Sequence, residues 1–176
     1  FQADIGAQVR TNGLTLHEAA TFGVAGYTAG LAVELLELNG MAPANGKALG
    51  LGDYAAWPED QRQRFLLQEL ESRRPLVPAD LPASPDVKEV LETFRTAAAI
   101  AAGSLGAYVI SMALAPSDVL AVELLQKDAH LPSPLRVVPL FETMEALAGA
   151  GTTLAHLLAL PWYRARCGGR QEVMVG

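Results

Sequence analysis

The sequence predicts an α/β fold with predominantly helical content, in which short parallel strands alternate with helices. Three observations predict it. Two continuous apolar runs, residues 106–112 and 135–141, lack the alternation of a half-exposed strand and are typical of strands buried on both faces of a sheet. Helix-type periods follow both runs. The order strand, helix, strand, helix, strand indicates βαβ crossovers and a parallel sheet, and both open doubly wound sheets and closed barrels fit it.

Two helices are expected before the first strand. Pro58 and the two acidic residues after it suit a first helical turn, because negative charge there favours the helix dipole. The Arg-Arg-Pro sequence of residues 73–75 should end this helix. The second helix should begin with Ser84 as N-cap and Pro85 in the first turn. Its apolar residues recur at helical spacing: Val87, Val90, Leu91 and Phe94.

Two further helices are expected after the first strand. Ser117 and Asp118 should cap the first of them, which fills the stretch between the two apolar runs. The other begins directly after the second run. Gly149 and Gly151 are expected to interrupt this helix before its pattern resumes over residues 152–160.

The chain is expected to divide into two parts. Residues 1–46 form a poorly defined N-terminal segment with scattered glycines and few charges, in which the apolar run 31–38 could be a helix. Residues 47–176 form the α/β segment, and its last predicted strand is 171–175. A complete β/α barrel needs about 250 residues, so this segment could supply only part of one.

Composition excludes several classes of protein. The chain has 176 residues and 18.6 kDa, of which 51% are hydrophobic and 18% charged, too apolar for a disordered chain. The net charge of −6 leaves no basic face, so we expect no nucleic-acid partner. No apolar run approaches the roughly 20 residues that a membrane helix needs, so we expect no membrane partner. The single cysteine, Cys167, favours a reducing compartment and a cytoplasmic location.

The two ends of the sequence suggest a piece of a larger protein. The chain begins at Phe1 rather than Met, without the basic and apolar regions of a signal peptide. It stops at Gly176 on a strand-like run, with no turn or polar tail after it.

Glu142 is the strongest candidate for chemistry. It follows the run 135–141 where a strand should end and a helix begin, which is where parallel sheets and barrels keep their reactive groups. A carboxylate there can hold a hard divalent cation through its oxygens. The alternative is that Glu142 only interacts with the dipole of the following helix.

Other polar residues have ordinary structural explanations. Asp118 is expected to cap a helix rather than to catalyse. Glu145, three residues after Glu142, is expected to be a solvated surface acid. The histidines share no metal-ligand spacing, and no Cys or His lies three or four residues from any of them; they are His17, His130 and His156.

A basic, glycine-bearing stretch surrounds the cysteine. Arg164, Arg166 and Arg170 are expected to lie on a solvated loop, with an approach to an anion as the alternative. Cys167 has no histidine nearby in sequence, so a structural or incidental role is expected.

Three stretches, in this order, resemble phosphoenolpyruvate carboxylase. Residues 107–125 read Ala-Tyr-Val-Ile-Ser-Met-Ala-Leu-Ala-Pro-Ser-Asp-Val-Leu-Ala-Val-Glu-Leu-Leu, and residues 135–143 read Leu-Arg-Val-Val-Pro-Leu-Phe-Glu-Thr. The third is Trp-Tyr-Arg at 162–164 with Gly-Arg-Gln-Glu-Val-Met-Val-Gly at 169–176. Similar segments also fall at 50–57 and 73–76, so the resemblance covers about residues 48–176.

The resemblance implies a carboxy-lyase that joins phosphoenolpyruvate and bicarbonate to give oxaloacetate and phosphate, with Mg²⁺ or Mn²⁺ as cofactor. It implies a long, largely helical, allosteric subunit built around a TIM-like β/α barrel, and a cytoplasmic homotetramer. The glutamate of the family's Pro-Leu-Phe-Glu segment is one of two carboxylate metal ligands, and that position here is Glu142.

The sequence also departs from the family. The second metal ligand of the family is an aspartate in a Tyr-Ser-Asp-Ser run directly after the strand that matches 171–176, and the chain stops before it. The family's Leu-Asp-Ile-Arg-Gln-Glu-Ser strand carries a substrate-binding arginine. Here the matching start, residues 13–16, continues His-Glu-Ala-Ala-Thr-Phe-Gly with Phe22 and no arginine. We hypothesise that residues 17–46 are a frameshifted or divergent version of that region.

The expected function is therefore that of a partial barrel segment of a phosphoenolpyruvate carboxylase, with Glu142 as its one metal ligand and no catalytic residue of its own. Alone it should be inactive, bind Mg²⁺ weakly and be prone to aggregate through unpaired strand edges. The alternative is a non-catalytic α/β binding or assembly module with a vestigial metal acid.

Overall fold

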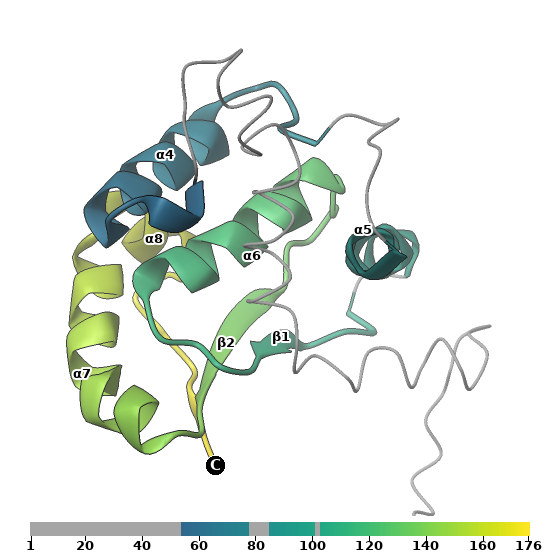
Figure 1. Ribbon diagram of the computed structural model, residues 1–176. Coiled ribbons are helices and arrows are strands. Elements are labelled where there is room, and N and C mark those ends of the chain that lie inside the picture. Colours follow the sequence, from purple (N-terminus) through teal and green to yellow (C-terminus); the bar gives the residue numbers. More distant parts are fainter. Residues whose placement is uncertain (1–53, 78–84, 101–102) are drawn as a thin grey trace, which may run out of the picture.

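The computed structural model describes residues 54–77, 85–100 and 103–176 (Figure 1). The possible helix at 31–38 and the predicted cap at Ser84 lie outside them. In chain order the elements are η2 (Tyr54–Ala56), α4 (Glu59–Glu71), α5 (Pro85–Ala99), β1 (Ala107–Ile110), α6 (Pro116–Asp128), β2 (Arg136–Phe141), α7 (Met144–Ala159), α8 (Pro161–Arg166) and β3 (Met174–Val175).

The strands form a parallel sheet in the order β1-β2-β3. Tyr108 lies opposite Val137, and Phe141 lies opposite Val175. Helix α6 connects β1 to β2, while α7 and α8 connect β2 to β3, so both connections are the helical crossovers that parallel pairing requires. Figure 1 shows α6 lying over β1 and β2, with α4 beside it. The α/β class predicted from the sequence is confirmed.

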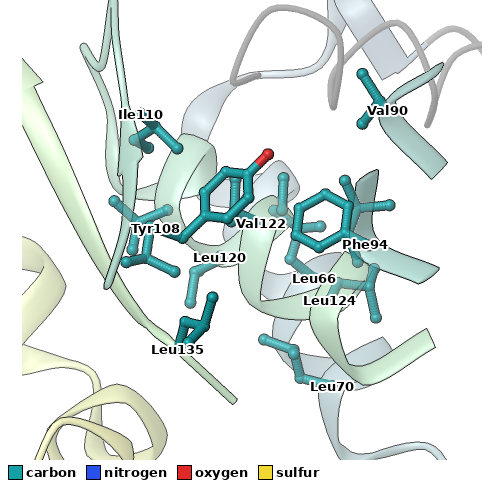
Figure 2. Packing of buried hydrophobic residues seen from close by; sticks show 14 of the residues in the cluster. Leu66, Leu70, Val90, Phe94, Tyr108, Ile110, Leu120, Val122, Leu124 and Leu135 are labelled. Atoms are coloured by element: carbon teal, nitrogen blue, oxygen red, sulfur yellow. The ribbon is translucent and has the colours of Figure 1, made fainter. Parts of the chain in front are cut away.

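Helix α6 forms the centre of the hydrophobic core because α4 packs against it and it also contacts the sheet. Its apolar side chains are almost completely buried, among them Leu120 and Leu124. Figure 2 shows the ring of Tyr108 from β1 next to Phe94 from α5, and the two rings stack with centroids 4.9 Å apart. Removal of this apolar surface from water is the main stabilising contribution to the domain.

Polar contacts fix α4 against α6 at both ends. The Glu59 carboxylate, in the first turn of α4, accepts hydrogen bonds from the Ser117 backbone N–H at 2.9 Å and the Ser117 hydroxyl at 2.6 Å. Glu59 therefore satisfies one of the unpaired N–H groups that begin α6. At the other end, the Lys127 ammonium donates to the backbone carbonyl of Glu69, where α4 ends.

The predicted interruption at Gly149 and Gly151 is wrong, because α7 runs unbroken through both glycines. Thr143 caps the helix by accepting a hydrogen bond from the Ala146 backbone N–H at 3.0 Å. Buried side chains also anchor α7, among them Leu157. Such capping and packing outweigh the cost of about 1 kcal/mol for each helical glycine.

The strands are shorter than predicted, and part of the predicted arginine loop is helical. β1 and β3 occupy only the middle of the first apolar run and the end of the last one. Arg164 and Arg166 lie in α8, and the turn after it uses Gly168 and Gly169, with φ of 60° and 72°. Glycine adopts these left-handed conformations without the steric cost that a Cβ brings. The predicted loop therefore begins only after α8.

Candidate metal-binding edge

The carboxyl ends of the three strands meet at one edge of the sheet. Glu142 directly follows β2, Met112 lies two residues after β1, and Gly176 directly follows β3. A Cβ at Gly176 would lie 3.4 Å from the Glu142 Cβ, so β3 ends against this side chain. Parallel sheets present their reactive groups at this edge, because all strands end there and loops begin.

Glu142 is exposed but oriented by its neighbour. Its Oε1 accepts a hydrogen bond from the Met112 backbone N–H at 3.1 Å, which links the ends of β2 and β1. Its Oε2 accepts no hydrogen bond from the residues that the structure describes. Thr143, rather than Glu142, provides the side-chain cap of α7. Within the described residues, the carboxylate thus has one hydrogen-bonded oxygen and one oxygen without a partner at the edge.

The backbone after β1 is strained where it meets Glu142. Met112 has a φ of 55°, a left-handed conformation that costs a non-glycine residue roughly 1–3 kcal/mol. Two side chains hold the following residues. Asp118 Oδ2 accepts hydrogen bonds from the backbone N–H groups of Leu114 and Ala115, both at 2.9 Å. The Thr153 hydroxyl, from α7, donates to the Leu114 carbonyl at 2.9 Å. We call residues 111–115 the β1 bend.

A divalent cation fits this edge only in part. Carboxylate oxygen is a suitable ligand for Mg²⁺ or Mn²⁺, and Glu142 offers one such oxygen. Within residues 54–77, 85–100 and 103–176, however, no group of three His, Cys, Asp or Glu side chains is placed to hold a metal. Glu142 is therefore suited to be one ligand of a cation whose other ligands lie elsewhere or are water.

The other acidic candidates are structural. Asp118 caps α6 by accepting from the residues before it, which agrees with its predicted role. Ser117, predicted to cap the same helix, does not do so, because its hydroxyl donates to Glu59 instead. Burial raises the pKa of Asp118, and its two backbone hydrogen bonds partly counteract this rise. Glu145 is exposed on α7, as expected for a surface acid.

Among the described residues, His130, His156 and Cys167 are not grouped with Glu142 as metal ligands. His130 follows α6 with a φ of 55° and is exposed, and His156 is exposed on α7. His17 lies outside the described residues. Cys167 is half-buried, and its thiol lies 3.6 Å from the Arg164 carbonyl oxygen.

Arg166 is not part of a solvated loop as predicted, because it pairs with a buried acid. Its Nε donates to Glu123 Oε2 at 3.1 Å, and its guanidinium also donates to the Leu135 carbonyl. Burial raises the pKa of Glu123 to about 7, although the Arg166 charge and hydrogen bond oppose this rise. The pair joins α8 to α6. The sequence alone does not indicate this pair, because Glu123 and Arg166 lie on different helices.

The groups that support Glu142 also give no signal in the sequence. The backbone N–H of Met112 and the hydroxyl of Thr153 carry no motif, since any residue offers an N–H and threonine is common in helices. The positive φ of Met112 is equally invisible, because left-handed conformations are expected mainly at Gly, Asn and Asp.

A family model for phosphoenolpyruvate carboxylase matches residues 44–176. Phosphoenolpyruvate carboxylase 2 of Sorghum bicolor is 54% identical over 128 residues, which are 73% of this chain and 13% of the relative. A housekeeping isozyme of phosphoenolpyruvate carboxylase from a Saccharum hybrid is 47% identical over 161 residues, 92% of this chain and 17% of the relative. Phosphoenolpyruvate carboxylase of Ectopseudomonas mendocina is 59% identical over 128 residues, 73% of this chain and 15% of the relative.

The chain belongs to the phosphoenolpyruvate carboxylase family, whose members are carboxy-lyases. It spans about one seventh of the length of the curated relatives that it matches. Among its described residues, none of the helices has the length and apolarity needed to cross a bilayer.

Proposed function

We propose that this chain forms part of the metal-binding edge of a phosphoenolpyruvate carboxylase, with Glu142 as one carboxylate ligand of Mg²⁺ or Mn²⁺. The observation that carries the proposal is the position of Glu142: it directly follows β2, and the Met112 N–H orients its Oε1. The activity is the formation of oxaloacetate and phosphate from phosphoenolpyruvate and bicarbonate. When bound, the cation supplies Lewis-acid chemistry to the substrate oxygens.

The sheet supports the proposal that the chain contributes strands to a TIM-like barrel. Its strands are parallel, joined by helical crossovers, and their carboxyl ends meet beside Glu142. The resemblance described above implies a second carboxylate ligand directly after the strand that ends at Gly176. The close approach of Gly176 to Glu142 supports this, because a residue following Gly176 would emerge next to the first ligand.

This chain does not turn over substrate by itself under this proposal. One carboxylate leaves most of the roughly six oxygen positions of the cation to water, so Mg²⁺ binding by the isolated chain is weak. The larger enzyme is a cytoplasmic, allosteric homo-oligomer, and its remaining ligands and substrate-binding groups come from other segments.

A chimera tests the proposal. Residues 49–176 of this chain replace the matching segment of the Ectopseudomonas mendocina enzyme, which is 59% identical over 128 residues. We expect oxaloacetate formation that depends on Mg²⁺ or Mn²⁺. The Glu142→Gln variant of the chimera should lower Mn²⁺ affinity at least tenfold and abolish most activity, because the amide carries no charge. Glu145→Gln, an exposed acid on the adjacent helix, is the matched control and should change neither quantity.

A non-catalytic binding or assembly module is the second candidate. The observation that favours it is that no three His, Cys, Asp or Glu side chains among the described residues are grouped to hold a metal. An active chimera would exclude it, whereas a chimera that folds and assembles without forming oxaloacetate would support it. Unchanged Mn²⁺ affinity in Glu142→Gln would contradict the metal-ligand role.

A further inference from the structure

We propose that the hydroxyl of Ser111 contacts the substrate, donating a hydrogen bond to an anionic oxygen that binds beside Glu142. This inference rests on the proposed function, because an anion is drawn to this acidic edge only with a cation present. It adds a substrate-contacting residue at the end of β1, where neither motifs nor side-chain charge indicate one.

The position of Ser111 places it at the metal-binding edge. It directly follows β1 and directly precedes Met112, whose backbone N–H bonds to Glu142. On β1, Tyr108 and Ile110 belong to the core cluster together with the side chains of α6 (Figure 2). Because side chains alternate along a strand, Ser111 is expected on the opposite face, away from this helical layer.

The hydroxyl of Ser111 is buried without a partner. The residue is 8% exposed, and its Oγ makes no hydrogen bond in the part of the chain that the structure describes. Buried polar atoms are nearly always hydrogen-bonded, so an unpartnered hydroxyl calls for an explanation such as an absent ligand. Ala, which lacks the hydroxyl, would fill this position without that cost. An oxygen ligand explains why a polar group is present there.

The β1 bend is held in place before any ligand arrives. Asp118 accepts from Leu114 and Ala115, and Thr153 donates to Leu114, so three hydrogen bonds from side chains fix the backbone just after Ser111. Met112, in its left-handed conformation, lies between Ser111 and these hydrogen-bonded residues. Such preorganisation is what a binding group requires, because an ordered donor loses little freedom when the ligand binds.

Oxyanions suit this donor. A serine hydroxyl can donate one hydrogen bond, and hydrogen bonds to charged oxygens are stronger than those between neutral groups. Phosphoenolpyruvate offers both phosphoryl and carboxylate oxygens. The shared chemistry is an anionic oxygen, and inorganic phosphate distinguishes the two sources because it carries only the phosphoryl type.

The test uses Ser111→Ala in the full-length chimera with Mg²⁺. We expect kcat/KM for phosphoenolpyruvate to fall by about tenfold to 100-fold, the loss typical of one hydrogen bond to a charged group. The thermal midpoint without ligands should stay the same or rise, because the variant removes an unpartnered buried hydroxyl. A structural role would instead lower that midpoint. Ser133→Ala is the matched control, since this exposed serine lies before β2, at the opposite end of that strand from Glu142.

The stabilisation by inorganic phosphate is the second readout. A smaller phosphate-induced rise in the thermal midpoint in Ser111→Ala assigns the contact to a phosphoryl oxygen, and an unchanged rise with a lowered kcat/KM assigns it to the carboxylate. If both quantities stay within twofold of those of the chimera, the inference is overturned. Glu142→Gln separates the two proposals: when it loses Mn²⁺ affinity and Ser111→Ala has no effect, only the Ser111 inference fails.

Discussion

The helical layer and the candidate metal-binding edge of this domain differ in how completely their polar groups are hydrogen-bonded. In the layer, α6 is buried between α4 and the sheet, and Glu59 and Lys127 tie both ends of the α4–α6 pair. At the edge, Glu142 and Met112 are exposed, Met112 is strained, and the Ser111 hydroxyl has no hydrogen-bond partner in the described part of the chain. The contacts of the helical layer stabilise the fold, whereas the edge retains backbone strain and polar groups that a ligand could bind.

The largest expected effect is the loss of stability when a buried leucine of the helical layer is truncated. Leu120→Ala should lower the free energy of unfolding by about 3 kcal/mol, because Leu120 is completely buried and its removal leaves a cavity. Leu147→Ala, at a residue 37% exposed, should cost about 1 kcal/mol or less. Urea unfolding of this chain followed by circular dichroism measures both. Equal losses would show that α6 is not the centre of stability.

The second largest effect is the pH dependence of stability that arises from the buried Glu123, which pairs with Arg166. The folded chain keeps a proton on Glu123 up to about pH 7, whereas the unfolded chain loses it near its ordinary pKa of 4.5. The folded state therefore binds more protons between these values, and its stability falls as pH rises through them, by up to about 3 kcal/mol.

Glu123→Gln isolates this contribution, because the raised pKa values of Asp118 and Asp128 remain in the variant. Unfolding free energies at pH 5 and pH 8 should differ less in the variant than in the unchanged chain. An identical pH dependence in both would mean that Glu123 is not buried as described.

The smallest expected effect is the release of backbone strain at two residues, one at the edge and one in the helical layer. Met112→Gly and His130→Gly each replace a residue with φ of 55° by one that adopts this conformation freely, so each should stabilise the fold by about 0.5–1 kcal/mol. Neither variant should change Mn²⁺ affinity in the chimera, because Met112→Gly keeps the backbone N–H that orients Glu142 and His130 follows α6. Thermal midpoints and a Mn²⁺ titration test this, and a lower thermal midpoint in either variant would contradict backbone strain at that residue.

Local patterns in the sequence predict the elements well and their tertiary partners poorly. The apolar runs locate β1 and β2 within two residues, and the acid at the end of β2 is found because strand and helix patterns meet there. Gly149 and Gly151 mislead, since intrinsic propensity is weaker than the packing of α7. The Glu123–Arg166 pair requires two helices to be placed before it can be seen.

The edge shows the same limit. Glu142 is predictable as a carboxylate at a strand end, but its orientation depends on the backbone of a residue 30 positions earlier. Ser111 carries no signal in the sequence, because it becomes a candidate only through its burial and its lack of a hydrogen-bond partner among the described residues. Both properties arise from the three-dimensional arrangement rather than from residue type.

Gln126, at the end of α6, has a consequence for how the sheet aligns itself. Its fully buried amide accepts from the Leu135 N–H at 2.6 Å and donates to the Leu135 carbonyl at 3.1 Å. This is the pair of hydrogen bonds that an adjoining strand would give to Leu135. A shift by one residue would turn every side chain of β2 to the opposite face of the sheet. The Gln126 amide disfavours such a shift, because it would lose both hydrogen bonds to Leu135, the residue before β2. The crossover helix α6 thereby helps to fix the register of the strand that follows it.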